Sequence, residues 1–308
     1  MRKVFIVFLL LFVSIKADDL SSNSNTYFNF INIFYDGKSS ALGKYSNANY
    51  GDYTNFLNNP ALLINAENSI VSNFSKILSD IYVGQISYLG KIKEYKYSTS
   101  IGYLNYGSIE GRDVNGEPTG DLSASDMMVN FSISHSLNRF LDFGLGVNFL
   151  YSSIDNSSCS GLGFNFGVIY RSSTKGNFAF SVTNVGFTLS KITENDEAKL
   201  PSKFIVGWSK ELAHLPVITS LSLSKKVEDD YFIHGGLIFK FMPSFFVRLG
   251  YFASLEDDIS FVASEATNKH GLTFGFNLMN IKKFDFDFSY VPFAHIGTIS
   301  TFSLKYKF

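Results

Sequence analysis

Hydrophobic and polar residues alternate with a period of two along most of this chain. The pattern is plain over residues 129–137, 143–151, 162–170 and 284–290. Side chains on a β-strand point to opposite faces in turn, so each of these segments has one apolar face and one face of polar or very small residues. A helix would need a period of 3.6 residues, which none of them shows. The alternation therefore predicts an all-β protein.

Fourteen such segments follow one another, and most of them are about ten to fourteen residues long. A strand in a soluble domain has about five to six residues, whereas a tilted strand that crosses a membrane needs about nine to eleven. The length favours a transmembrane barrel over a soluble sandwich. The predicted strands span residues 69–76, 80–91, 95–106, 125–138, 140–154, 161–172, 176–188, 202–213, 216–226, 230–241, 244–254, 270–280, 282–292 and 297–308.

The links between these strands differ in length in a regular way. The links after even-numbered strands are short, as at residues 138–139 and 242–243. Several of the others are long and polar, namely 107–124, 189–201 and 255–269. Outer-membrane barrels alternate short periplasmic turns with longer outer loops. We therefore predict an outer-membrane β-barrel of about 14 antiparallel strands in a Gram-negative bacterium, with both ends of the barrel on the periplasmic side.

The last predicted strand ends in an aromatic residue and keeps one apolar face. Phe302, Leu304, Tyr306 and Phe308 lie on that face, and they alternate with polar residues. A closing strand of this kind looks like the signal that the outer-membrane assembly machinery reads. We predict that these four residues form the barrel-assembly signal.

The first residues have the composition of a secretory signal peptide. Met1-Arg2-Lys3 is followed by an apolar run over residues 4–13 and by the small residue Ala17. An uncleaved membrane anchor would need about twenty apolar residues, roughly twice this run. We predict a signal peptide over residues 1–17, and we expect no transmembrane helix in the rest of the chain.

Residues 18–66 lack the long alternating segments and are rich in Asn, Ser, Asp, Tyr and Gly. The motif Asn58-Asn59-Pro60-Ala61 reads as a turn that enters a short helix, because proline suits the first helical position. About fifty residues are too many for a simple tail. We predict that they form a plug inside the lumen of a barrel made by residues 67–308, against an inner wall of mostly Gly, Ser and Asn.

The composition agrees with a membrane protein and excludes some soluble functions. Charged residues make up 17% of the chain, against about 25% in an ordinary soluble domain. With 26 basic and 27 acidic residues, the net charge of −1 lacks the positive surface of a nucleic-acid binder. The single cysteine excludes an internal disulfide and a thiolate metal cluster.

No motif in the sequence points to catalysis, a metal or a cofactor. The five histidines lie on different predicted strands or links without metal-ligand spacing, and we expect His135 to sit at the membrane–water boundary. The acidic groups at 113–117, 228–230 and 256–258 are interpreted as solvated outer loops rather than calcium sites. Cys159 falls in a predicted turn at 155–160 as a spare thiol. A hydrolase built from a Ser/His pair across strands is left open.

Several motifs resemble the PorV/PorQ group of the type IX secretion system. Residues 40–43 and 58–63 resemble the N-terminal plug pattern of that group, whose members are similar to fourteen-stranded FadL-type barrels. The segments 103–113, 184–186 and 210–216 look like the PorQ members in particular. So do Gly116, Thr119-Gly120, 123–126, 151–153 and 200–201. The resemblance is specific over about residues 40–220.

The resemblance implies a non-enzymatic anchor that holds the surface attachment complex, in which secreted cargo is processed. A PorZ-like surface protein is the expected partner, beside PorU and PorV, and outer-membrane lipid surrounds the barrel. We expect the long outer loops to form the partner surface. The alternative is a FadL-like transporter of hydrophobic small molecules. Apolar side chains inside the barrel would favour that alternative.

Overall fold

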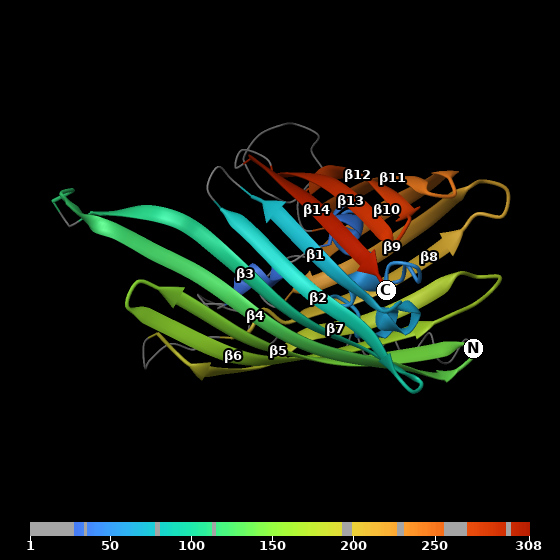
Figure 1. The fold of residues 1–308 in the computed structure, drawn as a ribbon, viewed down its shortest axis with the longest axis horizontal. Helices are drawn as coiled ribbons and strands as arrows, with labels where there is room; N and C mark the ends of the chain where they lie inside the picture. Colours follow the sequence, from blue (N-terminus) through green and yellow to red (C-terminus); the bar gives the residue numbers. More distant parts are fainter. Residues whose placement is uncertain are drawn as a thin grey trace.

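In a computed structural model the chain forms one closed barrel of fourteen antiparallel strands (Figure 1). The structure describes residues 28–33, 36–77, 81–112, 115–192, 199–226, 231–255, 270–293 and 297–308. The strands are β1 Ser69–Lys76, β2 Tyr82–Ile92, β3 Tyr95–Arg112, β4 Pro118–Asn138, β5 Leu141–Ile154, β6 Ser157–Tyr170, β7 Asn177–Ser190, β8 Lys203–Glu211, β9 Val217–Lys226, β10 Tyr231–Met242, β11 Phe245–Ser254, β12 His270–Ile281, β13 Phe284–Phe293 and β14 Gly297–Lys307. The prediction of a 14-stranded barrel is confirmed.

The barrel closes by pairing its first strand with its last. β1 runs antiparallel to β14 from Ser69 opposite Lys307 to Lys76 opposite Ser300, and each other strand pairs with its neighbours in sequence. Closure leaves no strand edge within the described wall, so the backbone N–H and C=O groups of the wall hydrogen-bond to each other and none is left unpaired toward lipid hydrocarbon. Within the described residues, none of the helices has the length and apolar character needed to cross a bilayer.

The two faces of the wall differ as the alternation predicts. On β1, Ile70 and Phe74 are 43% and 48% exposed on the outer face, while Val71 and Asn73 are buried on the inner face. Large apolar side chains are exposed in the same way on strands all around the barrel. A closed barrel with an apolar outer face is built for lipid. This fold confirms the predicted location in the outer membrane of a Gram-negative bacterium.

The prediction of a loop over residues 107–124 is wrong. Strands β3 and β4 continue through most of this range and pair with each other as far as Arg112 opposite Pro118. Beyond Asn105, β3 has no pairing with β2, and before Ala124, β4 has no pairing with β5. The two strands therefore extend past the wall as a two-stranded hairpin (Figure 1). The predicted loop 189–201 lies partly, and the loop 255–269 almost wholly, outside the described residues.

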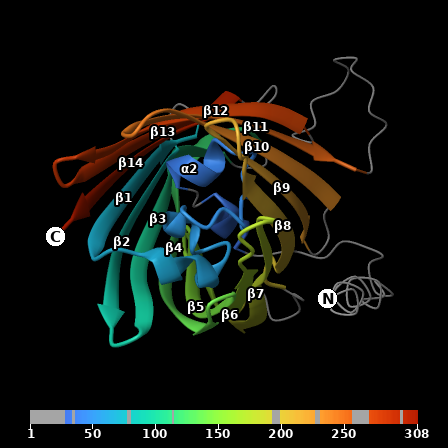
Figure 2. The ribbon, with the colours of Figure 1, turned by 90° about the vertical axis from the view of Figure 1, so that its right-hand side faces the viewer.

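The described residues before β1 lie inside the barrel (Figure 2). They form short helical turns: η1 Asn29–Asn32, α2 Gly37–Ser40, η2 Tyr53–Asn55 and η3 Pro60–Asn65. We call the described residues 28–33 and 36–66 the luminal segment. The predicted signal peptide, residues 1–17, lies outside the described residues.

The two ends of the barrel can be told apart, and each strand therefore has one half near each end. The turns after even-numbered strands and the two ends of the barrel chain share one end, which is the periplasmic end in a barrel of this type. We call the half of the barrel next to it the inner half. The half next to the β3–β4 hairpin is called the outer half.

Candidate functional site: the lumen

The predicted motif Asn58-Asn59-Pro60-Ala61 holds the luminal segment together. The Asn59 side chain accepts a hydrogen bond from the Ala61 backbone N–H at 3.0 Å, which caps η3 with Pro60 at its first position. The Asn59 amide also donates to the Asn47 carbonyl at 3.0 Å. Asn58 accepts a hydrogen bond from the buried Lys203 ammonium on β8 at 2.7 Å. The predicted helical turn is present, and its residues tie the segment to itself and to the wall.

Two wall glycines show how closely the segment fits. A Cβ atom at Gly144 on β5 would collide with the backbone of Pro60 and Ala61. A Cβ atom at Gly250 on β11 would collide with the backbone of Leu42 and Gly43. Only glycine permits backbone to approach backbone this closely. The small residues expected on the inner wall thus leave room for the luminal segment.

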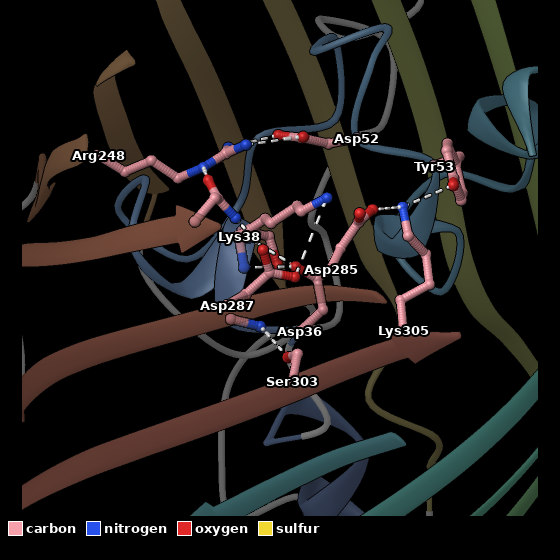
Figure 3. A network of polar contacts seen from close by, with 12 residues as sticks. Asp36, Lys38, Asp52, Tyr53, Arg248, Asp285, Asp287, Ser303 and Lys305 are labelled. Carbon is pink, nitrogen blue, oxygen red and sulfur yellow. Dashed lines mark hydrogen bonds and ion pairs between the residues drawn. The ribbon is translucent and has the colours of Figure 1, made fainter. Parts of the chain in front are cut away.

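Buried charged side chains link the luminal segment to β11–β14 in the inner half (Figure 3). Arg248 on β11 donates two hydrogen bonds to the Asp52 carboxylate, at 2.6 and 3.0 Å. Lys38 lies 4.0 Å from the Asp287 carboxylate on β13. The Gly37 backbone N–H donates to the Ser303 hydroxyl on β14 at 2.9 Å.

The network continues toward the periplasmic end. Lys305 on β14 forms an ion pair with Asp285 on β13 and donates to the Tyr53 hydroxyl at 2.8 Å (Figure 3). Lys307 lies 3.4 Å from Asp285 and 3.2 Å from Glu67. Buried charges are stable only when they are paired and hydrogen-bonded. We call this set of contacts the charge network. It fixes the position of the luminal segment against one side of the wall.

Burial raises the pKa of carboxyl groups in the luminal segment, whereas a neighbouring cation lowers it. Burial raises the pKa of Asp36 to about 6, and the Ser39 backbone N–H partly opposes the rise. Burial also acts on Asp52, but the Arg248 guanidinium holds the pKa of that carboxyl below its ordinary value. One oxygen of Asp36 caps α2, while its other oxygen is buried without a hydrogen-bond partner. Asp36 is therefore the carboxyl of the luminal segment that keeps its proton up to a pH of about 6.

Two apolar clusters line the outer half of the lumen, next to buried polar residues such as Asp126 and Lys203. Buried side chains from the outer halves of β2–β6 form one cluster with three residues of the luminal segment and with Leu200. A second apolar cluster lies in the outer halves of β11, β13 and β14. The wall residues of these clusters are Val83, Leu104, Met128, Leu150, Cys159, Phe252, Val291 and Ile299, and the residues of the luminal segment are Phe28, Phe30 and Ile31.

This apolar lining departs from the expected wall of mostly Gly, Ser and Asn. The expectation describes the inner half, where Ser132, Ser134 and Ser303 line the wall. It misses the outer half because one apolar inward residue per strand does not change the apparent polarity of that strand's inner face. A count of inward-facing positions near the outer ends of β2–β6 would have revealed the larger apolar cluster.

The remaining candidate residues have structural surroundings. Cys159 lies within β6, not in a turn, and its side chain is buried in the apolar cluster. His234 contacts the Gly43 carbonyl at 2.6 Å and the Ser224 hydroxyl at 2.8 Å. His135 lies between the rings of Tyr95 and Phe143. In the described part of the chain, no three His, Cys, Asp or Glu side chains are grouped to hold a metal.

Most residues of the acidic groups interpreted as solvated outer loops fall outside the part of the chain that the structure describes. Residues 228–230 and 256–258 lie outside the described residues, as do residues 113 and 114. The charge network is the feature that sequence reasoning missed. Its signal was present, since Asp285 and Asp287 occupy inward positions of one strand where serine or glycine is usual.

The four residues of the predicted assembly signal lie together on the outer face. Phe302, Leu304, Tyr306 and Phe308 are between 36% and 58% exposed. The ring of Phe308 lies 5.9 Å from that of Tyr88 on β2, on the other side of β1. Their position leaves them accessible to lipid or to another protein.

Comparison with known proteins shows the fold and no closer relationship. No family model and no curated protein matches the chain. The *Pseudomonas putida* toluene transporter TodX is similar in structure, with a TM-score of 0.62 and 11% identity over 88% of this chain and 96% of that one. The *Ralstonia pickettii* toluene transporter TbuX has a TM-score of 0.59 and 15% identity, over 89% and 98% of the two chains.

A FadL homologue from *Pseudomonas aeruginosa* has a TM-score of 0.54 and 10% identity, over 94% of this chain and 99% of that one. At these identities the likeness concerns the fold alone. The chain thus has the fold of the FadL-type outer-membrane barrels. TodX and TbuX are described as toluene transporters, and none of the three descriptions names protein secretion.

Proposed function

We propose that the protein takes up hydrophobic small molecules from outside the cell through the outer half of its lumen. The apolar lining of that half carries the proposal. Met128 and Leu150, from adjacent strands, are fully buried there with no polar group to satisfy. Ligand sites for hydrophobic molecules are concave and lined mainly by apolar side chains. The related folds of TodX and TbuX, described as toluene transporters, support the same function.

In this proposal the luminal segment acts as the predicted plug. Its closely fitted backbone and the charge network occupy the inner half, which keeps hydrophilic solutes from passing. Phe28 and Phe30 fill part of the apolar outer half, together with Leu200. A hydrophobic ligand replaces these side chains when it binds, so that apolar contacts are exchanged rather than lost.

Uptake of the dye N-phenylnaphthylamine by intact Gram-negative cells tests this function. The lipopolysaccharide leaflet excludes the dye, and its fluorescence rises when it reaches phospholipid. Cells that express the protein should take up the dye faster than cells that do not. Met128→Gln should slow this uptake, because it places an amide in the apolar lining at nearly constant volume. Leu122→Gln is the matched control, since Leu122 lies on the hairpin outside the wall and is 38% exposed.

Equal uptake with and without the protein would contradict the proposed function. Each variant is checked for folding by the mobility shift of unheated barrel in gel electrophoresis. Uptake that depends on the barrel but is unchanged in Met128→Gln would argue against the apolar lining as the route.

A role as a PorQ-like anchor of the type IX secretion system is the second candidate. The feature that favours it is the β3–β4 hairpin, which extends beyond the wall and contains residues 106–112 of the segment 103–113 that resembles that group. Its strand edges are unpaired beyond the barrel and therefore suited to pairing with another chain. A PorZ-like surface protein is the proposed partner. Recovery of that partner on the cell surface after deletion of residues 107–124 would count against the hairpin as its anchor.

A further inference from the structure

Basic side chains surround the periplasmic end of the barrel. Lys93 lies in the turn β2–β3, Arg139 in β4–β5 and Lys175 in β6–β7. Lys210 stands at the end of β8, and Lys282 and Lys283 form the turn β12–β13. We call these six residues the basic rim. They belong to five different turns, so the positive charge is spread around the barrel rather than gathered in one patch.

The basic rim differs from the other cations at this end because its members lack acidic partners. Lys240 forms an ion pair with Glu211 at 2.6 Å, and Arg171 forms one with the buried Asp142 at 2.7 Å. No described carboxylate lies in ion-pair contact with any member of the basic rim. Five of the six side chains are exposed, and Lys210 is half-buried. Their charge is thus available to an external anion.

Aromatic side chains of the outer face accompany the basic rim. The Arg139 guanidinium lies 4.5 Å from the centre of the Phe140 ring, and the Lys283 ammonium lies 5.9 Å from that of Tyr306. The indole N–H of Trp208 donates to the Lys175 carbonyl at 2.9 Å. Trp208 lies on the lipid-facing side of β8, since its neighbours Gly207 and Ser209 are the buried, inward residues. Aromatic rings in this position mark the level of the lipid headgroups.

We propose that the basic rim binds the headgroups of anionic phospholipids in the inner leaflet of the outer membrane. The cations lie at the headgroup level, are spread over five turns of the barrel and have no acidic partner among the described residues. A basic segment at a membrane surface gains binding free energy from each Lys or Arg that meets an anionic lipid. An acidic periplasmic protein would fit a single patch better than a ring of separate cations.

The only tryptophan of the chain makes the proposal measurable, because Trp208 contacts the residue Lys175 of the basic rim. The complete protein without its predicted signal peptide is reconstituted in phosphatidylcholine bilayers that contain a small fraction of brominated lipid, which quenches tryptophan fluorescence. Brominated phosphatidylglycerol should quench Trp208 more strongly than brominated phosphatidylcholine. We expect an apparent preference of about fivefold at low salt, and screening at about 0.5 M NaCl should abolish it.

Two matched pairs of substitutions locate the binding site. Lys175→Gln with Lys210→Gln should abolish the preference seen by Trp208. Lys282→Gln with Lys283→Gln removes the same charge several strands away and should leave it unchanged. Equal quenching by the two brominated lipids in the unmodified protein overturns the proposal. A preference that persists in the Lys175→Gln, Lys210→Gln variant also overturns it. The same holds if quenching does not depend on lipid charge while added polyglutamate changes Trp208 emission.

Discussion

Arg248 on β11 and Asp52 in the luminal segment form a two-pronged ion pair inside the barrel, with N–O distances of 2.6 and 3.0 Å. Their side chains are 4% and 7% exposed. The two residues are 196 positions apart in sequence, so the pair joins the luminal segment to a strand in the second half of the chain.

Replacing Asp52 by alanine leaves the Arg248 charge buried without its partner. We expect the free energy of unfolding to fall by about 3–5 kcal/mol, the usual cost of breaking a buried pair. Denaturant titration of the detergent-solubilised barrel measures this loss. The control Glu211→Ala breaks the exposed pair with Lys240 and should cost no more than about 1 kcal/mol. Equal effects of the two substitutions would contradict a structural role for the Arg248–Asp52 pair.

The raised pKa of Asp36 predicts a pH dependence of luminal-segment docking. The docked carboxyl binds its proton with a pKa of about 6, above the ordinary value of 3.8 in the undocked chain. The stabilisation from this proton is therefore complete below about pH 4 and is lost as the pH rises to about 6. The loss amounts to about 3 kcal/mol, because one pKa unit corresponds to about 1.4 kcal/mol.

Asp36→Asn should remove this dependence and keep the helix cap, since asparagine caps helices as well as aspartate does. Hydrogen exchange of residues 36–47 between pH 4 and pH 7, corrected for intrinsic rates, checks the prediction. Protection that changes with pH equally in both proteins would assign the effect to another group.

Because Gly144 lies against the Pro60 backbone, we predict that an alanine at this position lowers stability, whereas an alanine at an open glycine position does not. Gly144→Ala forces η3 away from β5 and should cost about 1–3 kcal/mol of stability, as overpacking does. Gly84→Ala on β2 is the matched control, because a Cβ atom there meets nothing within 4 Å. Thermal unfolding of both variants measures the difference. Similar melting temperatures would show that the segment is not seated on the wall as closely as described.

The position of Phe308 predicts a defect in assembly rather than in stability. Phe308→Ser removes an aromatic ring that is 53% exposed at the end of the closing strand. We expect less folded barrel in the outer membrane, while refolding of the purified protein in detergent stays nearly unchanged. Phe241→Ser is the control, because Phe241 is 64% exposed at the same end of the barrel but on β10. Equal losses in the membrane for both variants would show that the last residue carries no special signal.

The strands could be predicted closely from the sequence because lipid constrains them. Each lipid-facing position must be apolar, so β1 and the start of β14 match their predicted limits at residues 69–76 and 297. The hairpin beyond Asn105 and before Ala124 lies outside the lipid and has no such constraint. Its glycines and charges therefore look like a loop, although the two strands continue to pair.

The contents of the lumen were less predictable, since they depend on partners far apart in the chain. The turn at Asn59-Pro60 is local and was predicted. The pairing of Lys38 with Asp287 and of Asp52 with Arg248 requires the closed barrel to bring those residues together. The apolar cluster in the outer half likewise arises from single residues on the separate strands β2–β6, which the closed barrel brings together.

Diffraction from crystals of the protein soaked in bromobenzene tests the central claim, since anomalous scattering locates bromine directly. The account predicts a bromine site in the outer half of the lumen beside Met128 and Leu150, with Phe28 displaced from the apolar cluster. Bromine found only on the lipid-facing surface or in the polar inner half would contradict the proposal that this lumen receives hydrophobic molecules.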